Sequence, residues 1–160
     1  MRQCIVFLDR ASIPSHIAIP KPALEHEWIE YEASSPENIA ERVKDATVII
    51  VNKVVIDRAL IQQLPKLQHI AVIATGYNNV DVDTCREQGV SVSNTRGYAS
   101  TSVPEHTIAL IFALRRHLLQ YQYSVREGEW QTSPHFHHYL SPTRDLANSQ
   151  IGLILSLIHI

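Results

Sequence analysis

The chain of 160 residues has only five glycines, and they are not spaced as a nucleotide-binding turn requires. Neither a G-x-G-x-x-G turn nor a Walker loop occurs anywhere in the sequence. Both motifs need glycine so that backbone N–H groups at a helix N-terminus can approach a phosphate closely. These two common ways of holding a nucleotide are therefore excluded for these residues.

Cysteine and net charge are also scarce. Two cysteines, Cys4 and Cys85, cannot form a disulfide framework, and we expect both to be small core residues of a cytoplasmic protein. The formal net charge of −2 offers no attraction for nucleic acid or an anionic membrane. No apolar run is long and uncharged enough to span a bilayer, and the N-terminus lacks signal-peptide features. We therefore expect neither nucleic acid nor membrane as a partner.

What the sequence contains instead is an alternation of short apolar, β-branched runs with helical segments. The runs predict strands at residues 3–8, 28–31, 47–51, 69–74 and 90–93. The third is continuously apolar, as expected for a parallel strand covered on both faces. Ser35, Asp57 and Asp81 are N-cap signals for the intervening helices. The alternation predicts an α/β fold, a doubly wound parallel sheet with flavodoxin-like strand order.

A longer helix is predicted after this domain. Ser102 and Glu105 have the spacing of a capping box, with Ser102 as the N-cap. Residues 107–114 are almost wholly apolar, so we expect this helix to be buried on most sides and to end near Gly128. Residues 130–145 show no steady periodicity and are predicted to form a long loop.

The last predicted strand, at residues 148–154, resembles the first strand of a dinucleotide-binding βαβ unit, but no glycine-rich turn follows it. We therefore expect an α/β domain at 1–98. Residues 99–154 would supply an interdomain helix, a loop and the first strand of a truncated Rossmann domain. Residues 155–160 do not continue the pattern. We interpret them as translated vector sequence ending a truncated chain, with a genuine apolar strand as the alternative.

The loop after the fourth strand is the main candidate for a binding site. Ligands bind at the carboxyl ends of strands in open α/β sheets, and residues 74–81 follow such an end. Gly76 would let a ligand approach the backbone, where successive N–H groups could hold a carboxylate. The alternative is a turn in which glycine and asparagine supply positive φ. Lys53, after the third strand, would place a positive charge over the same anion or would simply be solvated.

No other cluster points to chemistry. His135, His137 and His138 lie close together, but their spacing matches no common zinc pattern. We expect them to be surface residues of a loop, and we expect no metal site. No Ser/His/Asp arrangement and no pair of carboxylates indicates a catalytic group.

Several segments, taken in order, resemble the D-2-hydroxyacid dehydrogenase family, and within it the glycerate dehydrogenase (hydroxypyruvate reductase) group. They are VNKVVID at 51–57, ATGYNNVD at 74–81, GVSVSNTRGY at 89–98, SVPEHT at 102–107, GEW at 128–130, and DL at 145–146 leading to IGLI at 151–154. The resemblance covers nearly the whole chain and roughly half of a typical member. It implies a substrate-binding domain and a second domain that binds NAD or NADP, with the active site between them.

The resemblance also implies roles for individual residues. Lys53 and the backbone at Thr75, Gly76 and Tyr77 match positions on the side of the substrate carboxylate. Thr101 matches a position beside the nicotinamide. The family's catalytic histidine, arginine and carboxylate come after residue 154, so none can be placed in this sequence.

On these grounds we expect the N-terminal fragment of an NAD(P)-dependent oxidoreductase. The parent would reduce a small 2-keto acid, hydroxypyruvate or glyoxylate, to a D-2-hydroxy acid such as D-glycerate. We expect the chain alone to be inactive, to bind no dinucleotide well, and to form a homodimer through the helix at 102–116. The alternative is a non-enzymatic α/β module that binds a small anion or dimerises. The sequence decides neither the 2-hydroxy acid nor the choice between NAD and NADP.

Overall fold

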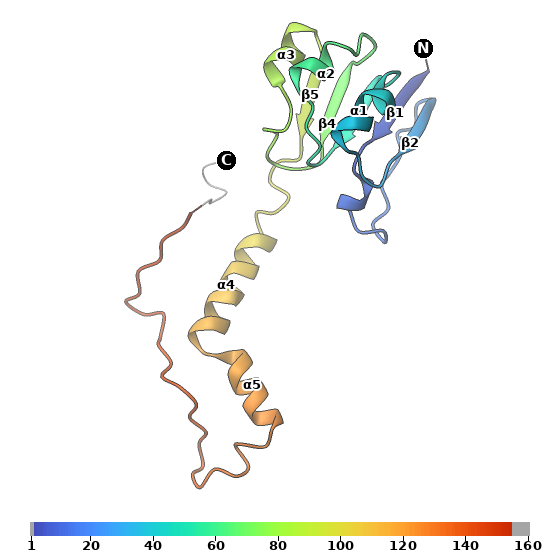
Figure 1. Cartoon of the computed structure of the whole chain (residues 1–160). Helices are drawn as coiled ribbons and strands as arrows, with labels where there is room; N and C mark the ends of the chain where they lie inside the picture. Colours follow the sequence, from blue (N-terminus) through green and yellow to red (C-terminus); the bar gives the residue numbers. More distant parts are fainter. Residues whose placement is uncertain (1, 155–160) are drawn as a thin grey trace. The chain divides into compact units, whose positions relative to one another are not determined.

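The computed structural model describes residues 2–154, which fall into two compact units that divide after Gly97. The first unit holds a parallel sheet with its helices (Figure 1). The second holds two helices and a long irregular segment. The interpretation of residues 155–160 as vector sequence concerns positions outside the described residues.

The sheet of the first unit has five strands. They are β1 Gln3–Phe7, β2 His26–Glu30, β3 Val48–Val51, β4 His69–Val72 and β5 Ser91–Asn94. Every neighbouring pair is parallel, and the order across the sheet is β2-β1-β3-β4-β5. This is the flavodoxin-like order, so the predicted α/β fold is confirmed.

The α-helices of this unit begin at the residues that the cap signals predict. They are α1 Pro36–Val43, α2 Arg58–Ile61 and α3 Val82–Glu87. A short 3₁₀ turn, η1 Arg10–Ser12, was not predicted. Asp57 and Asp81 each accept a backbone N–H of the first turn at 2.9 Å, which satisfies a donor that the helix itself leaves unpaired. Gly89, at φ 71°, follows the end of α3 as a left-handed residue.

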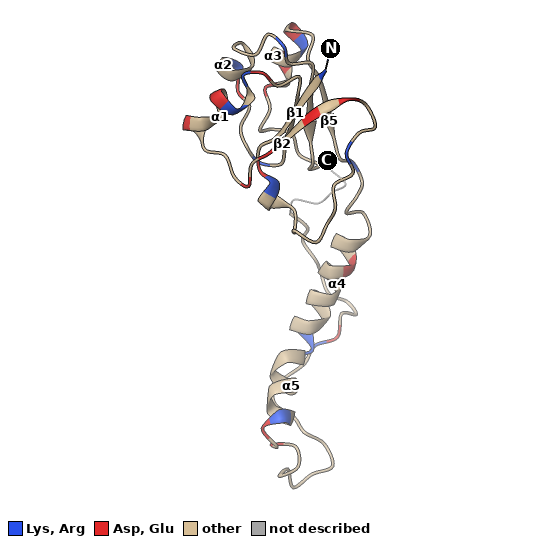
Figure 2. Ribbon diagram, turned by 90° about the vertical axis from the view of Figure 1, so that its right-hand side faces the viewer, with Lys and Arg blue, Asp and Glu red and all other residues tan. Residues whose placement is uncertain are grey.

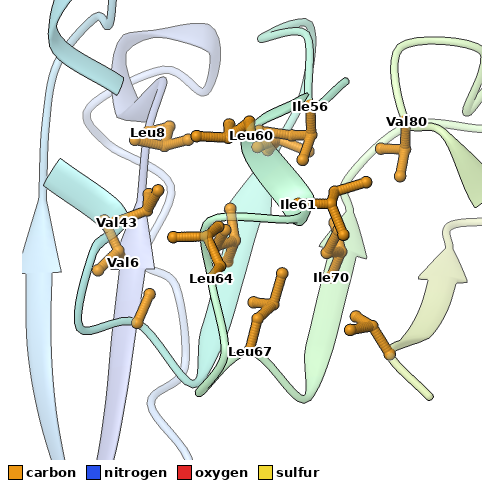
Figure 3. Close-up of a cluster of buried hydrophobic side chains, with 14 of the residues drawn as sticks. Val6, Leu8, Val43, Ile56, Leu60, Ile61, Leu64, Leu67, Ile70 and Val80 are labelled. Carbon is orange, nitrogen blue, oxygen red and sulfur yellow. The ribbon is translucent and has the colours of Figure 1, made fainter. Parts of the chain in front are cut away.

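The core lies between the helices and one face of the sheet. The register sets Val6, Ile49 and Ile70 side by side on that face, because side chains alternate between faces along each strand. Figure 3 shows buried side chains from α1 and α2 packed over these strands. All three α-helices lie on the same side of the sheet (Figure 2). Because the strands are parallel, the loops that follow them gather at one edge of the sheet, which is where a binding site is expected.

The second unit contains α4 Ser102–Arg115 and α5 Leu118–Arg126. Two details of the prediction are wrong here. Thr101, not Ser102, is the N-cap of α4, and its side chain makes no cap hydrogen bond. The single helix expected up to Gly128 is broken at His117, whose φ of 51° is left-handed and cannot continue a right-handed helix.

Helix α4 was expected to be buried on most sides, and this is also wrong. It contains no buried residue. The other described residues of its unit are α5 and an irregular segment, and neither buries a side chain of α4. Residues 148–154 form no strand, because a strand needs a neighbour for its backbone groups and the described part of this unit has none. Within residues 2–154, no helix has the length and apolar character needed to cross a bilayer.

Candidate functional site

The candidate site lies at the edge of the sheet formed by the carboxyl ends of the strands. Lys53 follows β3, and Thr75, Gly76 and Tyr77 follow β4, which pairs with β3 in parallel. Four of the predicted site residues therefore share one edge of the first unit. Thr101 belongs to the second unit, where it precedes α4.

The loops after β3 and β4 are joined by hydrogen bonds. The side-chain amide of Asn79 donates to the carbonyl of Val54 at 2.8 Å. The N–H of Ile56 donates to the carbonyl of Asn79 at 2.8 Å, and the N–H of Asp81 donates to the carbonyl of Ile56 at 3.0 Å. The two loops therefore form one connected structure.

The end of β5 holds the same loop from its other side. The side-chain amide of Asn94 donates to the carbonyl of Thr75 at 2.7 Å. The Thr75 hydroxyl donates to the carbonyl of Thr95 at 3.1 Å, and the Thr95 N–H donates to the carbonyl of Ala74 at 3.1 Å. The hydroxyl of Thr75 is thus used inside the protein, which leaves the backbone that follows it to meet a ligand.

Gly76 and Tyr77 present backbone donors without a protein partner. Their N–H groups donate to no acceptor within residues 2–154, and the Tyr77 side chain is 51% exposed. Neither Gly76 nor Asn78 and Asn79 has a positive φ, so the alternative of a turn that requires one is wrong. A Cβ on Gly76 would lie 3.5 Å from Asn78 Oδ1, an ordinary contact. N–H groups that have no acceptor among the described residues are available to hydrogen-bond an anionic ligand.

Lys53 adds a positive charge at this edge. Its side chain is exposed, and its ammonium forms no ion pair with a carboxylate of the described residues. Its backbone N–H donates to Asp9 Oδ2 at 2.8 Å. An ammonium and free N–H groups at one edge suit a small carboxylate ligand.

Asp9 is the residue of this edge that the sequence analysis missed. It follows β1, is 9% exposed, and accepts hydrogen bonds from backbone N–H groups of the loop after β3. The available signal was an acidic residue directly after an apolar strand at the ligand-binding edge. That signal could not be interpreted without knowing which loop the carboxylate meets.

Among the described residues, the histidines and cysteines form no second site. His138 Nε2 lies 2.5 Å from Ser124 Oγ, which also contacts Glu129, but Ser124 is buried and Glu129 approaches the same ring nitrogen. This is not the arrangement of a nucleophile, base and orienting acid. Burial raises the pKa of the Cys4 and Cys85 thiols, which favours the thiol over the nucleophilic thiolate. No metal-binding group of three side chains occurs among residues 2–154.

The sequence matches a known family over most of its length. The family model described as "D-isomer specific 2-hydroxyacid dehydrogenase, catalytic domain" matches residues 6–150. A Haemophilus influenzae protein named "Putative 2-hydroxyacid dehydrogenase" is 48% identical over 149 residues, which are 93% of this chain and 47% of that protein. Glycerate dehydrogenase of Methylorubrum extorquens is 41% identical over 155 residues, which are 96% of this chain and 49% of that protein.

A solved structure agrees with the sequence matches. The 2-hydroxyacid dehydrogenase of Ketogulonicigenium vulgare superposes with a TM-score of 0.67 at 25% identity, covering 91% of this chain and 45% of that one. The chain thus spans about half the length of the relatives it matches. Because the family model covers most of the chain and the parallel sheet agrees with it, the chain belongs to the D-isomer specific 2-hydroxyacid dehydrogenase family.

Proposed function

We propose that this chain provides the acid-binding part of an NAD(P)-dependent dehydrogenase that reduces a small 2-keto acid, hydroxypyruvate or glyoxylate, to a D-2-hydroxy acid. The observation that carries the proposal is the pair of free N–H groups at Gly76 and Tyr77 on the same sheet edge as Lys53. The similarity to a glycerate dehydrogenase supports this substrate class.

Each residue has a definite part in the proposed site. The N–H groups of Gly76 and Tyr77 receive the carboxylate of the acid, and the Lys53 ammonium balances its charge. Thr75 fixes the loop through its bonds to the end of β5. Thr101 is proposed to lie beside the nicotinamide of a bound dinucleotide.

The described residues do not fit the dinucleotide itself. The segment at 151–154 forms no strand, and no glycine-rich turn occurs in the sequence. No residue set for hydride chemistry, namely a histidine, an arginine and a tuning carboxylate, is assigned in this chain. We therefore propose that the chain binds the acid but does not reduce it.

Helix α4 supports a proposal about assembly. Its residues Ile108, Leu110 and Phe112 are about half exposed, and its charged residues lie toward its ends (Figure 2). Exposed apolar area of this extent stabilises association when it is covered, by about 25 cal/mol per Å². We propose that a second copy of the chain covers it, giving a homodimer.

Calorimetric titration with hydroxypyruvate tests the proposed function. The wild-type chain should bind, and Lys53→Gln should weaken binding by about tenfold, the effect of losing one charge-assisted contact. Lys66→Gln is the matched control, because Lys66 precedes β4 at the opposite end of the strands and pairs with Asp45 at 2.6 Å. Absence of binding, or equal losses in both variants, would overturn the proposal. NADH oxidation above a blank would contradict the proposed lack of turnover.

A further inference from the structure

The carboxylate of Asp9 is surrounded by backbone donors from a loop more than forty residues away in sequence. Asn52 N donates to Asp9 Oδ1 and Oδ2 at 2.9 and 3.0 Å, and Lys53 N donates to Oδ2 at 2.8 Å. Val54 N lies 3.4 Å from the same Oδ2. Three successive N–H groups thus point at one buried carboxylate, which is the arrangement that binds an external anion elsewhere in α/β folds.

Asp9 does not use its side chain to cap the short helix that it precedes. It is the N-cap of η1, but its side chain makes no cap hydrogen bond there. Its carboxylate is turned to the loop after β3 instead. Burying a charged group is costly unless its hydrogen bonds are made, so this contact holds both partners in place.

The loop that Asp9 holds is the one that carries Lys53. The same loop is bonded through the Val54 carbonyl to Asn79, and so to the loop of Gly76 and Tyr77. The N–H groups of residues 52–54 at this edge are therefore hydrogen-bonded within the protein. The N–H groups of Gly76 and Tyr77 have no acceptor among the described residues.

We propose that Asp9 is a positioning residue for the acid-binding edge. By accepting hydrogen bonds from the N–H groups of residues 52–54, it fixes the backbone from which Lys53 extends, and so it holds the Lys53 ammonium where the carboxylate of a bound 2-keto acid needs it. This inference rests on the proposed function. It acts through Lys53 and needs no contact between Asp9 and the acid.

The first test measures, without any ligand, the strength of the hydrogen bonds between the Asp9 carboxylate and the N–H groups of residues 52–54, which we call the Asp9 clamp. In Asp9→Asn, the side-chain NH₂ replaces one acceptor oxygen and opposes the backbone donors. Amide hydrogen exchange at Asn52 and Lys53, followed by NMR, should accelerate by about tenfold or more, as expected when a hydrogen bond to a charged group is lost. Asn38→Ala is the matched control, because it removes a side-chain acceptor from Ser35 N, 3.1 Å away at the start of α1. Equal acceleration at Asn52 and Lys53 in both variants would overturn the proposal.

The second test is a double-mutant cycle on hydroxypyruvate binding by the whole chain. Asp9→Asn and Lys53→Gln should each weaken binding by about tenfold, and the double variant should be no weaker than Lys53→Gln alone. Multiplied losses in the double variant would show that Asp9 does not act through Lys53, and would overturn the inference. If the wild-type chain binds no hydroxypyruvate while exchange still shows the clamp, the proposed function fails and Asp9 is a structural residue only.

Discussion

The two units of this chain differ in how far they bury their apolar side chains. Ile49 and Ile70 are fully buried in the first unit, whereas Ile108 of α4 is 54% exposed in the second. The segments that carry them are comparably rich in apolar residues. Apolar composition therefore predicts that a segment must be covered by another element, but it does not predict that the described chain provides that element.

The difference follows from what each unit offers for packing. In the first, three helices and a sheet bury one another, and caps such as Asp57 satisfy the helix ends. In the second, α4 has no buried residue and its N-cap makes no side-chain bond. Helical stability in proteins comes mostly from packing of the apolar face, so the first unit should be the more resistant to unfolding.

The largest expected effect is the difference in stability loss between a buried isoleucine of the first unit and an exposed isoleucine of the second. Ile70→Ala should lower the free energy of unfolding of the first unit by about 2–5 kcal/mol, because it leaves a cavity under fully buried neighbours. Ile108→Ala should change the stability of the second unit by no more than about 0.5 kcal/mol when the chain is diluted to the monomer, where Ile108 is half exposed.

Tryptophan fluorescence during urea unfolding can measure each unit separately. Trp28 lies in β2 and Trp130 in the second unit, so Trp130→Phe leaves a reporter of the first unit alone. Trp28→Phe leaves a reporter of the second. If Ile70→Ala and Ile108→Ala lowered the free energy of unfolding equally, the proposed difference in burial between the two units would be contradicted.

A second prediction concerns association. Ile108→Glu should weaken self-association by at least about tenfold, because a charge replaces apolar area that the second copy would cover. Leu24→Glu is the matched control: Leu24 is 53% exposed in a loop of the first unit, against 54% for Ile108. Sedimentation velocity over a concentration series measures both. A wild-type chain that stays monomeric, or the same shift in both variants, would refute the dimer through α4.

A third, smaller effect compares the helix caps. Asp57→Ala removes the acceptor of Leu60 N, 2.9 Å away, and should cost the first unit about 1 kcal/mol. Thr101→Ala should leave the second unit unchanged within error, because the Thr101 side chain makes no cap bond. Urea unfolding followed by Trp28 and Trp130 respectively gives both values, and a loss in Thr101→Ala comparable to that in Asp57→Ala would contradict the account.

The smallest predicted effect depends on pH. Burial lowers the pKa of His69 below its ordinary value of 6.5. Between those two pKa values the unfolded chain binds more protons, so the stabilising contribution is complete above about pH 6.5 and is lost as pH falls through the folded pKa. Urea midpoints read from Trp28 should therefore fall slightly from pH 7.5 to pH 5, and His69→Gln should reduce this slope. His106→Gln, in the other unit, serves as the control, and an unchanged slope in His69→Gln would refute the prediction.

Much of the first unit was predictable because its signals are local and consistent. A continuous apolar run such as 47–51 is specific for a buried parallel strand, and an aspartate before a helix has one main use. The strand order then followed from the alternation of strands and helices. That Lys53 and Gly76 share one edge of the sheet was predictable for the same reason, since parallel strands place their carboxyl ends together.

The rest depended on contacts that the sequence does not encode locally. The hydrogen bonds of Asp9 are made to a loop 43 residues away, and no periodicity links the two. The helix break at His117 could not be predicted, because a left-handed residue within a polar stretch changes neither the composition nor the periodicity of the sequence. The burial expected for α4 failed because an apolar helix indicates that a partner is needed, not where the partner comes from.

The most direct test of the proposed acid site is an amide NMR titration of the wild-type chain with hydroxypyruvate. If the open N–H groups of the sheet edge hold the carboxylate, the amides of Gly76 and Tyr77 should show the largest shifts. Those of Asn52 and Val54, already bonded to Asp9, should move less. The largest shifts at Asn52 and Val54, or no shift at Gly76 and Tyr77 at saturating acid, would contradict the proposed site.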